Sequence, residues 1–235
     1  MKHLRLLFTA LFLFICIAAI HAETAEEIIN KHIKAIGGID VWKKITSVKL
    51  TGSVTAQGTE INISMVGVQG KGVRQDITIM GMTGYSFLTP TEGWMYMPFN
   101  GQQKAEALTA DQVKESQDEL DIQGELIDYK LKGHTVELIG KEDVEGTECW
   151  KLKITLKSGK VKTEFFDPES FYLIREVSKN KANGQEHEQV TNYSNFQKLP
   201  EGITVPMTIG SGMGELVVKK FEINTKIEDS LFKAG

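Results

Sequence analysis

Apolar and polar residues alternate in short runs along most of this 235-residue chain. Between Trp150 and Leu156, for example, every second residue is apolar and the residues between are lysine or threonine. Successive side chains of a strand point to opposite faces of its sheet, so this period predicts β-strands that bury one face. The runs lie at residues 48–56, 61–65, 73–79, 85–89, 94–98, 150–156, 161–166, 171–178, 187–196, 203–209 and 215–226, and one more begins at Val136.

Residues that favour turns bound each run, for example Gly70-Lys71-Gly72 and Ser158-Gly159-Lys160. Short strands joined by tight turns are typical of an antiparallel meander. The pattern predicts a mainly β (α+β) protein with roughly ten to eleven strands, and one sheet of that size tends to curl.

Two segments interrupt the strands with helical periodicity. The first begins at Thr24, which has capping-box spacing to Glu27, and it ends at Gly37-Gly38. A short further turn of helix follows it. The second segment is the polar stretch 108–129, with Thr109 as its N-cap. We expect the helices to cover the concave face of the curled sheet.

The first 22 residues have the composition of a secretory signal peptide. Lys2 and Arg5 precede an apolar run, residues 6–20, and Ala22 is a small residue at a plausible cleavage site before Glu23. The alternatives are a membrane anchor, for which the run is short, and a lipoprotein signal. We therefore expect residues 23–235 to form one exported domain.

The lipoprotein alternative depends on Cys16, which would carry the lipid after cleavage. The residues before it, 13–15, are bulky, whereas bacterial lipoprotein signals have small residues there. The cleaved chain then retains a single cysteine, Cys149, so its fold does not depend on an internal disulfide. We expect a monomer with a free thiol.

The charge of the chain disfavours some partners. The net charge is −4, and removal of Lys2 and Arg5 with the signal makes it −6. A mildly acidic protein is a poor partner for nucleic acid or for an anionic lipid surface. We expect no nucleic-acid partner.

Signatures of catalysis and of cofactor binding are missing from the sequence. There is no HExxH metal motif, no GxSxG nucleophile motif and no phosphate-binding P-loop. Cys149 alternates with Trp150, so the two side chains are expected on opposite faces of a strand. The sequence predicts a protein that is not an enzyme and that needs no metal or cofactor.

The positive functional signal is a concentration of methionine and aromatic residues between positions 65 and 99. Methionine adapts to ligands of variable shape, and tryptophan and tyrosine offer a large contact area with a polar end. The alternative is an ordinary packed core. If a helix covers the curled sheet, the space between them is an apolar slot, which is where lipophilic ligands bind. The residues expected to line the slot are Met65, Ile77, Ile79, Met80, Met82, Tyr85, Phe87, Trp94, Tyr96 and Met97.

Several stretches together give the chain a family resemblance. They are Ala35-Ile36-Gly37-Gly38, Gly93-Trp94-Met95-Tyr96-Met97-Pro98, the acidic insert after it, Phe166-Asp167-Pro168 and the closing Ile227-Glu228-Asp229-Ser230-Leu231-Phe232. With these features the chain resembles the LolA-like superfamily of periplasmic lipoprotein-sorting proteins. The resemblance extends over most of the chain after the signal.

The resemblance implies a curved antiparallel half-barrel, lidded by helices, with an apolar cavity for acyl chains. It implies a periplasmic location and a carrier that moves lipoproteins or other lipids from an inner-membrane donor to an outer-membrane acceptor. Carriers of this family also have a cavity arginine, and Arg74 lies in the corresponding region of this sequence. The alternative function is a lipid-responsive sensor or an envelope scaffold with the same fold.

Overall fold

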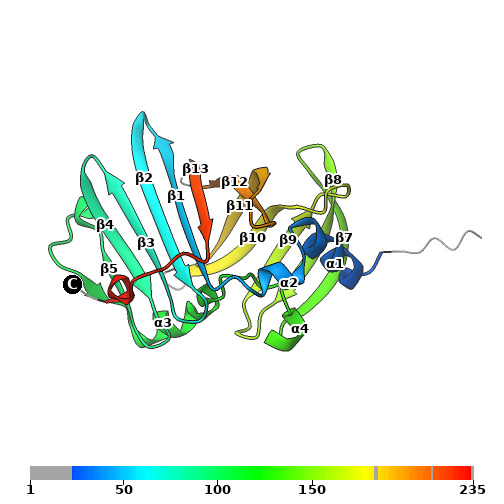
Figure 1. Ribbon diagram of the computed structural model, residues 1–235, viewed down its shortest axis with the longest axis horizontal. Helices are drawn as coiled ribbons and strands as arrows, with labels where there is room; N and C mark the ends of the chain where they lie inside the picture. Colours follow the sequence, from blue (N-terminus) through cyan, green and yellow to red (C-terminus); the bar gives the residue numbers. More distant parts are fainter. Residues whose placement is uncertain (1–22, 183–184, 213, 234–235) are drawn as a thin grey trace, which may run out of the picture.

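The alternating runs form strands that join into one antiparallel sheet (Figure 1). The structure is a computed structural model that describes residues 23–182, 185–212 and 214–233; the expected signal peptide, residues 1–22, lies outside this part of the chain. Within these ranges the sheet has thirteen strands, in the order β6-β5-β4-β3-β2-β1-β13-β12-β11-β10-β9-β8-β7. The prediction of an antiparallel, mainly β fold is therefore confirmed, with more strands than the roughly ten to eleven expected.

The strands are β1 (Ser47–Ala56), β2 (Thr59–Val68), β3 (Gly72–Ile79), β4 (Met82–Leu88), β5 (Gly93–Tyr96), β6 (Glu106–Ala107), β7 (Thr135–Val144), β8 (Thr147–Thr155), β9 (Val161–Phe166), β10 (Leu173–Ala182), β11 (Gln185–Lys198), β12 (Thr204–Ser211) and β13 (Gly214–Ile223). The helices are α1 (Ala25–Ala35), α2 (Ile39–Trp42), α3 (Ala110–Glu115) and α4 (Tyr129–Lys132), with 3₁₀ turns η1 (Pro98–Asn100), η2 (Gln117–Leu120) and η3 (Asp229–Phe232).

The sheet consists of two meanders, β1–β6 and β7–β13, joined edge to edge where β1 pairs with β13. At this joint the register shifts between Thr51 and Gly52. A Cβ atom on Gly52 would lie 2.4 Å from the carbonyl oxygen of Val217, so glycine is required for the close approach of the two strands. Through this pairing the last strand lies beside the first one, and the two meanders form one continuous sheet.

The capping box expected at Thr24 and the N-cap expected at Thr109 are both present, and Thr109 also forms a capping box. Thr24 accepts a hydrogen bond from the backbone N–H of Glu27, whose carboxylate accepts one from the backbone N–H of Thr24. Thr109 and Gln112 make the same reciprocal pair at the start of α3. The expected helical insert forms only short helices, since α3 and η2 end before residue 121.

We call the face of the sheet that packs against α1 and α2 the inner face. At the joint it carries Leu50, Val54, Leu216 and Val218, which are all buried. At the β7 end it carries a second cluster, in which α1 lies on β8 and β9. Its members are Ile28, Ile29, Ile33, Leu126, Ile127, Leu152, Ile154, Leu156 and Phe166.

The opposite, outer face has smaller clusters. On β2, β4 and β5 it carries Val66, Phe87 and Trp94, which the C-terminal residues Leu231 and Phe232 cover. The last described turn, η3, lies at the β5 end of the molecule, and α1 lies at the other end (Figure 1). The β4 end of the sheet is therefore covered on both faces, because α3 and η2 pack on the inner face against Leu88. No helix among the described residues has the length and apolar character needed to span a membrane.

Candidate functional site

The inner face is not completely filled, because a loop crosses it without packing closely against all of it. This inner loop, residues 117–127, includes η2 and contributes to the walls of three adjoining cavities. Gln69 fixes its middle by accepting a hydrogen bond from the backbone N–H of Ile122 (2.8 Å) and donating one to Asp121 (2.9 Å). Gln123 donates to the backbone carbonyl of Ile45 (3.0 Å).

The first cavity, the helix cavity, lies between α1, α2, the inner loop and the strands β9–β13 and has a volume of about 370 Å³. Its apolar walls include Ile33, Ile36, Leu173 and Phe221. The second, the sheet cavity, lies over β2–β4 and has a volume of about 350 Å³. Cavities of 300–1,000 Å³ with mainly apolar walls are typical of small-molecule sites.

The two apolar cavities share three side chains. Trp42, Ile122 and Phe221 line both of them. The indole of Trp42 donates a hydrogen bond to the carbonyl of Ile36 (3.0 Å), which fixes its orientation. The cavities are therefore two parts of one inner space that these side chains divide.

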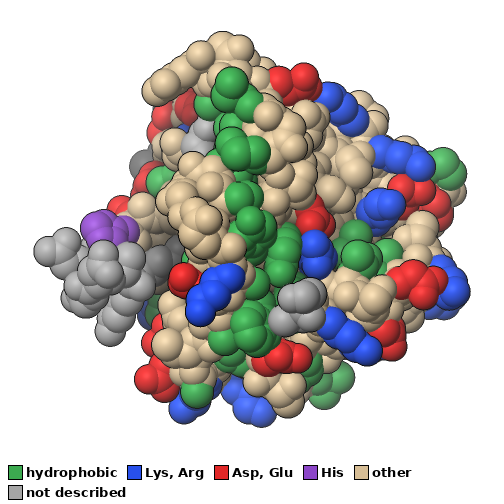
Figure 2. Space-filling model, turned by 90° about the vertical axis from the view of Figure 1, so that its left-hand side faces the viewer, with side chains coloured by type: hydrophobic (Ala, Val, Ile, Leu, Met, Phe, Trp, Pro, Cys, Tyr) green, Lys and Arg blue, Asp and Glu red, His purple; other side chains and the backbone are tan. Residues whose placement is uncertain are grey.

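Beyond the sheet cavity the inner face exposes methionine. Met65 is 42% exposed, Met82 47% and Met95 39%, and strand register places all three on the inner face. From the β4–β5 side, hydrophobic side chains form a band across the surface (Figure 2). Flexible apolar side chains thus continue from the sheet cavity toward the edge of the sheet.

The ten residues expected to line one slot lie on both faces of the sheet. The inner face carries Met65, Ile77, Ile79 and Met82, and Met97 lies against Gly84 on the same side. Met80 is in the β3–β4 turn and is 83% exposed. The outer face carries Tyr85, Phe87, Trp94 and Tyr96. Only Met65 and Phe87 of the ten line the sheet cavity.

Arg74 does not occupy the position that the family resemblance implied. It lies on the outer face, next to the inward-facing Gln75, because strand alternation reverses the side at each residue. Its guanidinium donates to Asp76 (2.7 Å) and to the carbonyl of Leu231 (3.0 Å), over the ring of Tyr85. Arg74 therefore fixes the C-terminal segment to the outer face.

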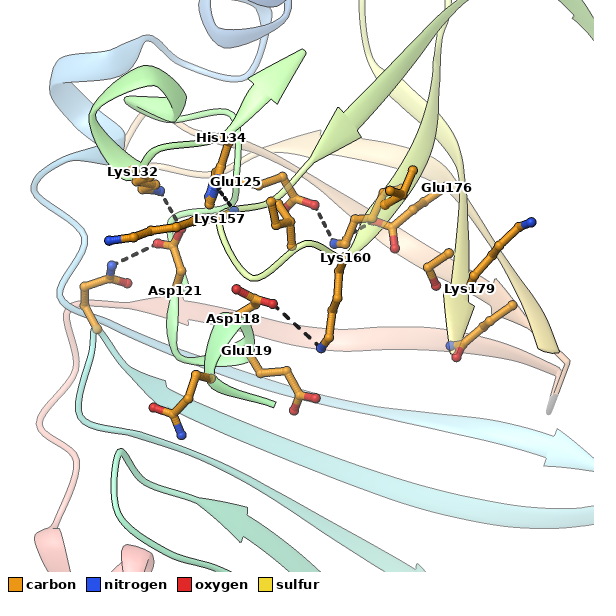
Figure 3. Close-up of a pocket in the computed structure, with 17 residues that line it drawn as sticks. Asp118, Glu119, Asp121, Glu125, Lys132, His134, Lys157, Lys160, Glu176 and Lys179 are labelled. Atoms are coloured by element: carbon orange, nitrogen blue, oxygen red, sulfur yellow. Dashed lines mark hydrogen bonds and ion pairs between the residues drawn. The ribbon is translucent and has the colours of Figure 1, made fainter. Parts of the chain in front are cut away.

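The third cavity is charged and has a volume of about 600 Å³ (Figure 3). Ion pairs cross it, among them Lys132–Asp121 at 2.5 Å and Lys160–Asp118 at 3.7 Å. Glu125 and Glu176 line both this cavity and the helix cavity, and they point toward each other in Figure 3. The carboxylates of Glu125 and Glu176 therefore lie between the charged cavity and the apolar helix cavity.

Four charged side chains meet at this boundary: Glu125 of the inner loop, Lys162 and Glu164 of β9, and Glu176 of β10. The nearest carboxylate oxygens of the three glutamates lie within 4.8 Å of one another. Lys162 forms ion pairs with Glu125 and, at 3.3 Å, with Glu176. We call these four residues the glutamate cluster.

The pKa values in the glutamate cluster are strongly perturbed. Burial, and then repulsion from Glu125, raises the pKa of Glu164 well above its usual range, and burial also raises the pKa of Glu176. Burial opposes ionisation of Glu125, but the ion pair with Lys162 lowers the pKa of Glu125. Because burial and the neighbouring carboxylate of Glu125 both oppose its ionisation, Glu164 is the member of the cluster that favours the protonated form.

Sequence reasoning missed the glutamate cluster. Lys162 and Glu164 alternate with Val161 and Phe165, and this period places both charges on the same side as the buried Phe166. Charged residues on the buried side of a strand were a signal in the sequence. The contact with the inner loop and β10 could not be read from it.

Cys149 and Trp150 face opposite sides of β8, as expected. Cys149 is fully buried on the outer face with Val144 and Phe165, and Trp150 packs against the inner cluster. Burial raises the pKa of the Cys149 thiol. A buried thiol with a raised pKa is a poor nucleophile, so Cys149 has the properties of a structural residue.

No protein-family model and no curated protein matches this sequence. Solved structures resemble it in fold. A LolA superfamily protein from Nitrosomonas europaea superposes with a TM-score of 0.54 at 13% identity, covering 90% of this chain and 98% of that one. A DUF1329 family protein from Desulfovibrio piger superposes with a TM-score of 0.53 at 12% identity, with the same coverage. The chain has a LolA-like fold.

Proposed function

We propose that this chain is a non-enzymatic carrier of the periplasm that binds the acyl chains of lipoproteins or of other lipids along its inner face. The observation that carries this proposal is the pair of apolar cavities between the sheet, α2 and the inner loop. The LolA-like fold supports it. In this proposal residues 1–22 are a cleaved signal peptide and residues 23–235 form the exported domain.

The energetics of lipid transfer explain why a protein is needed. Each buried CH₂ group is worth ~0.8 kcal/mol, so an acyl chain of about sixteen carbons faces a barrier on the order of 10 kcal/mol to enter water. Walls formed by residues such as Ile33, Ile36, Leu173 and Phe221 replace the hydrocarbon that the chain leaves. The carrier then moves the lipid from an inner-membrane donor toward an outer-membrane acceptor.

The inner loop is the element that admits the ligand. It separates the helix cavity from the sheet cavity at Ile122, and side-chain hydrogen bonds from Gln69 and Gln123 fix its middle. The hydrogen bonds at Ile122 and Gln123 are neutral and contribute only about 0.5–1.5 kcal/mol each, so the stretch between the ion-paired Asp121 and Glu125 opens at lower free energy than the packed clusters. Its opening joins the two cavities into one space long enough for an acyl chain.

The test compares two methionines. Met65→Glu places a charge in the sheet cavity, whereas Met80→Glu makes the same substitution in a turn that lines none of the three cavities. Displacement of a fluorescent fatty-acid probe from lipid-free protein measures binding, and thermal melting measures folding. Met65→Glu should weaken binding about tenfold or more, equivalent to about 1.4 kcal/mol, with a small melting shift, and Met80→Glu should change neither.

A third variant separates binding from packing. Phe87 is 2% exposed and packs against Phe232 on the outer face, so Phe87→Glu should lower the melting temperature strongly. If the wild type does not bind the probe, the carrier proposal fails. If lipid binds and is never passed to acceptor vesicles, a lipid-responsive sensor is the better function.

A further inference from the structure

The glutamate cluster contains more acidic side chains than basic ones. Three carboxyl groups, Glu125, Glu164 and Glu176, face one ammonium, that of Lys162. Two other titratable groups face the cluster from α1 and β11, and both are uncharged. Burial lowers the pKa of His32 to about 4, and burial raises the pKa of Tyr193 above its usual range.

Glu164 is the incomplete member of the cluster. It is 1% exposed, and its Oε2 atom receives no hydrogen bond from any group among the described residues. A buried carboxyl oxygen without a donor costs free energy, so a side chain in this position is suited to receive a donor from outside the chain. Glu164 therefore gives an observation independent of the acidic clustering.

The glutamate cluster borders an apolar cavity. Glu125, Glu164 and Glu176 all line the helix cavity, together with apolar side chains such as Leu173 and Phe221. A ligand that fits this arrangement has a hydrogen-bonding cation at one end and an apolar body. Fatty-acid carboxylates and phosphates have the wrong sign for a head group at this position.

We propose that the helix cavity binds an amphiphile with a protonated amine head, and that the ammonium group lies against Glu164 in the glutamate cluster. This inference rests on the proposed lipid-binding function and specifies the head group. The binding step is a proton exchange. The ligand ammonium donates a hydrogen bond to Glu164, the carboxyl proton of Glu164 leaves to solvent, and the net charge of the cluster with its occupant is unchanged.

A bare divalent cation fits these residues less well. Lys162 already lies between Glu125 and Glu176, so a metal ion would have to displace it and leave its ammonium buried without a partner. A single ammonium instead replaces the one proton on Glu164 and leaves both ion pairs of Lys162 in place. An organic ligand would also pack against the apolar walls beside the cluster, whereas a metal ion would not.

The test uses three ligands that share one hydrocarbon chain: decylamine, decanol and decanoate. Each competes with the uncharged probe N-phenyl-1-naphthylamine for lipid-free protein at pH 7. We expect decylamine to displace the probe at a concentration at least about tenfold lower than decanol, with decanoate the weakest. Calorimetry in two buffers of different ionisation enthalpy should detect proton release on binding of the amine only.

Glutamine variants locate the head group. Glu164→Gln imitates the protonated carboxyl and cannot ionise, so it should reduce the preference for amine over alcohol to less than about threefold. Glu148→Gln is the matched control, since the side chain of Glu148 is 72% exposed on β8 and lines none of the three cavities. It should retain the preference. Should Glu164→Gln not fold, Glu176→Gln takes its place and is expected to act in the same direction.

The outcomes separate the two proposals. Displacement by decanol and decanoate without a preference for decylamine overturns the amine inference and leaves the carrier function standing. An amine preference that survives in Glu164→Gln also overturns it. Competition by Mn²⁺ or Ca²⁺ that depends on Glu164 assigns the cluster to a divalent cation instead. Failure of the probe and of all three ligands to bind the wild type refutes the carrier function itself.

Discussion

Replacing Glu164 by glutamine should alter how the stability of the lipid-free protein depends on pH. The unfolded side chain has a pKa of 4.5, and burial raises the pKa of the folded one well above this. At a pH between these two pKa values, Glu164 keeps its proton in the folded state and has lost it in the unfolded state. The stability due to this group is therefore fully present below pH 4.5 and is lost as the pH rises through the folded pKa.

The size of the effect follows from linkage. One proton difference changes the free energy of unfolding by about 1.4 kcal/mol per pH unit. The glutamine that replaces Glu164 has no proton to lose, and its amide, like a protonated carboxyl, places no further negative charge beside Glu125. Starting near pH 4.5, the variant should therefore gain stability relative to the wild type by up to about 1.4 kcal/mol for each pH unit, until the folded pKa is passed.

Urea unfolding at pH 4, 5, 6 and 7 measures this difference, because the pH effects of groups that do not interact with Glu164 are common to both proteins. Glu148→Gln is the matched control: its side chain is 72% exposed on β8, where it pairs with Lys141. The free energies of this control should run parallel to those of the wild type. A constant difference between Glu164→Gln and the wild type from pH 4 to 7 would refute a buried proton on Glu164.

Two further predictions concern single residues outside the cavities. Cys149 is fully buried, and burial raises the pKa of its thiol, so a thiol reagent should label native protein only at the rate of unfolding and label urea-unfolded protein at once. Gly37 has a φ of +121°, and a Cβ atom there would lie 2.6 Å from the carbonyl oxygen of Gly202. Gly37→Ala should lower the free energy of unfolding by about 2 kcal/mol or more in urea melts, whereas Gly212→Ala, with open space around it, should change it little.

Local signals in the sequence were sufficient for the secondary structure. Thr24 forms the capping box that its spacing to Glu27 predicts, and Thr109 is the predicted N-cap, since caps depend only on residues a few positions apart. The alternating runs form strands as predicted, because alternation is also a signal between near neighbours in the sequence. The two-residue strand β6 was not predicted, because two residues are too few for a period to be visible.

Which face of each strand is covered depended on contacts that are distant in the sequence. Phe87 and Trp94 share a face, as alternation requires, but only the return of Phe232 decides that this face is a packed core. Likewise Glu125 and Glu164 meet because the inner loop crosses β9. A period of two shows which residues share a face of the strand, but it does not show what covers that face.

The inner loop is held in a way that limits how a ligand can enter. Leu120 and Ile127 are buried in different apolar clusters, so both ends of the segment are fixed by packing. Residues 121–125 are only partly buried, and polar contacts hold them: Gln69 bonds to Asp121 and to Ile122, and ion pairs fix Asp121 and Glu125 at the two ends of this stretch. Because burial of one large apolar side chain contributes about 1.5–3 kcal/mol and a neutral hydrogen bond about 0.5–1.5 kcal/mol, the middle yields before the ends. Entry therefore requires the middle of the loop to bow away from Trp42, while α1 and the packing beneath it stay in place.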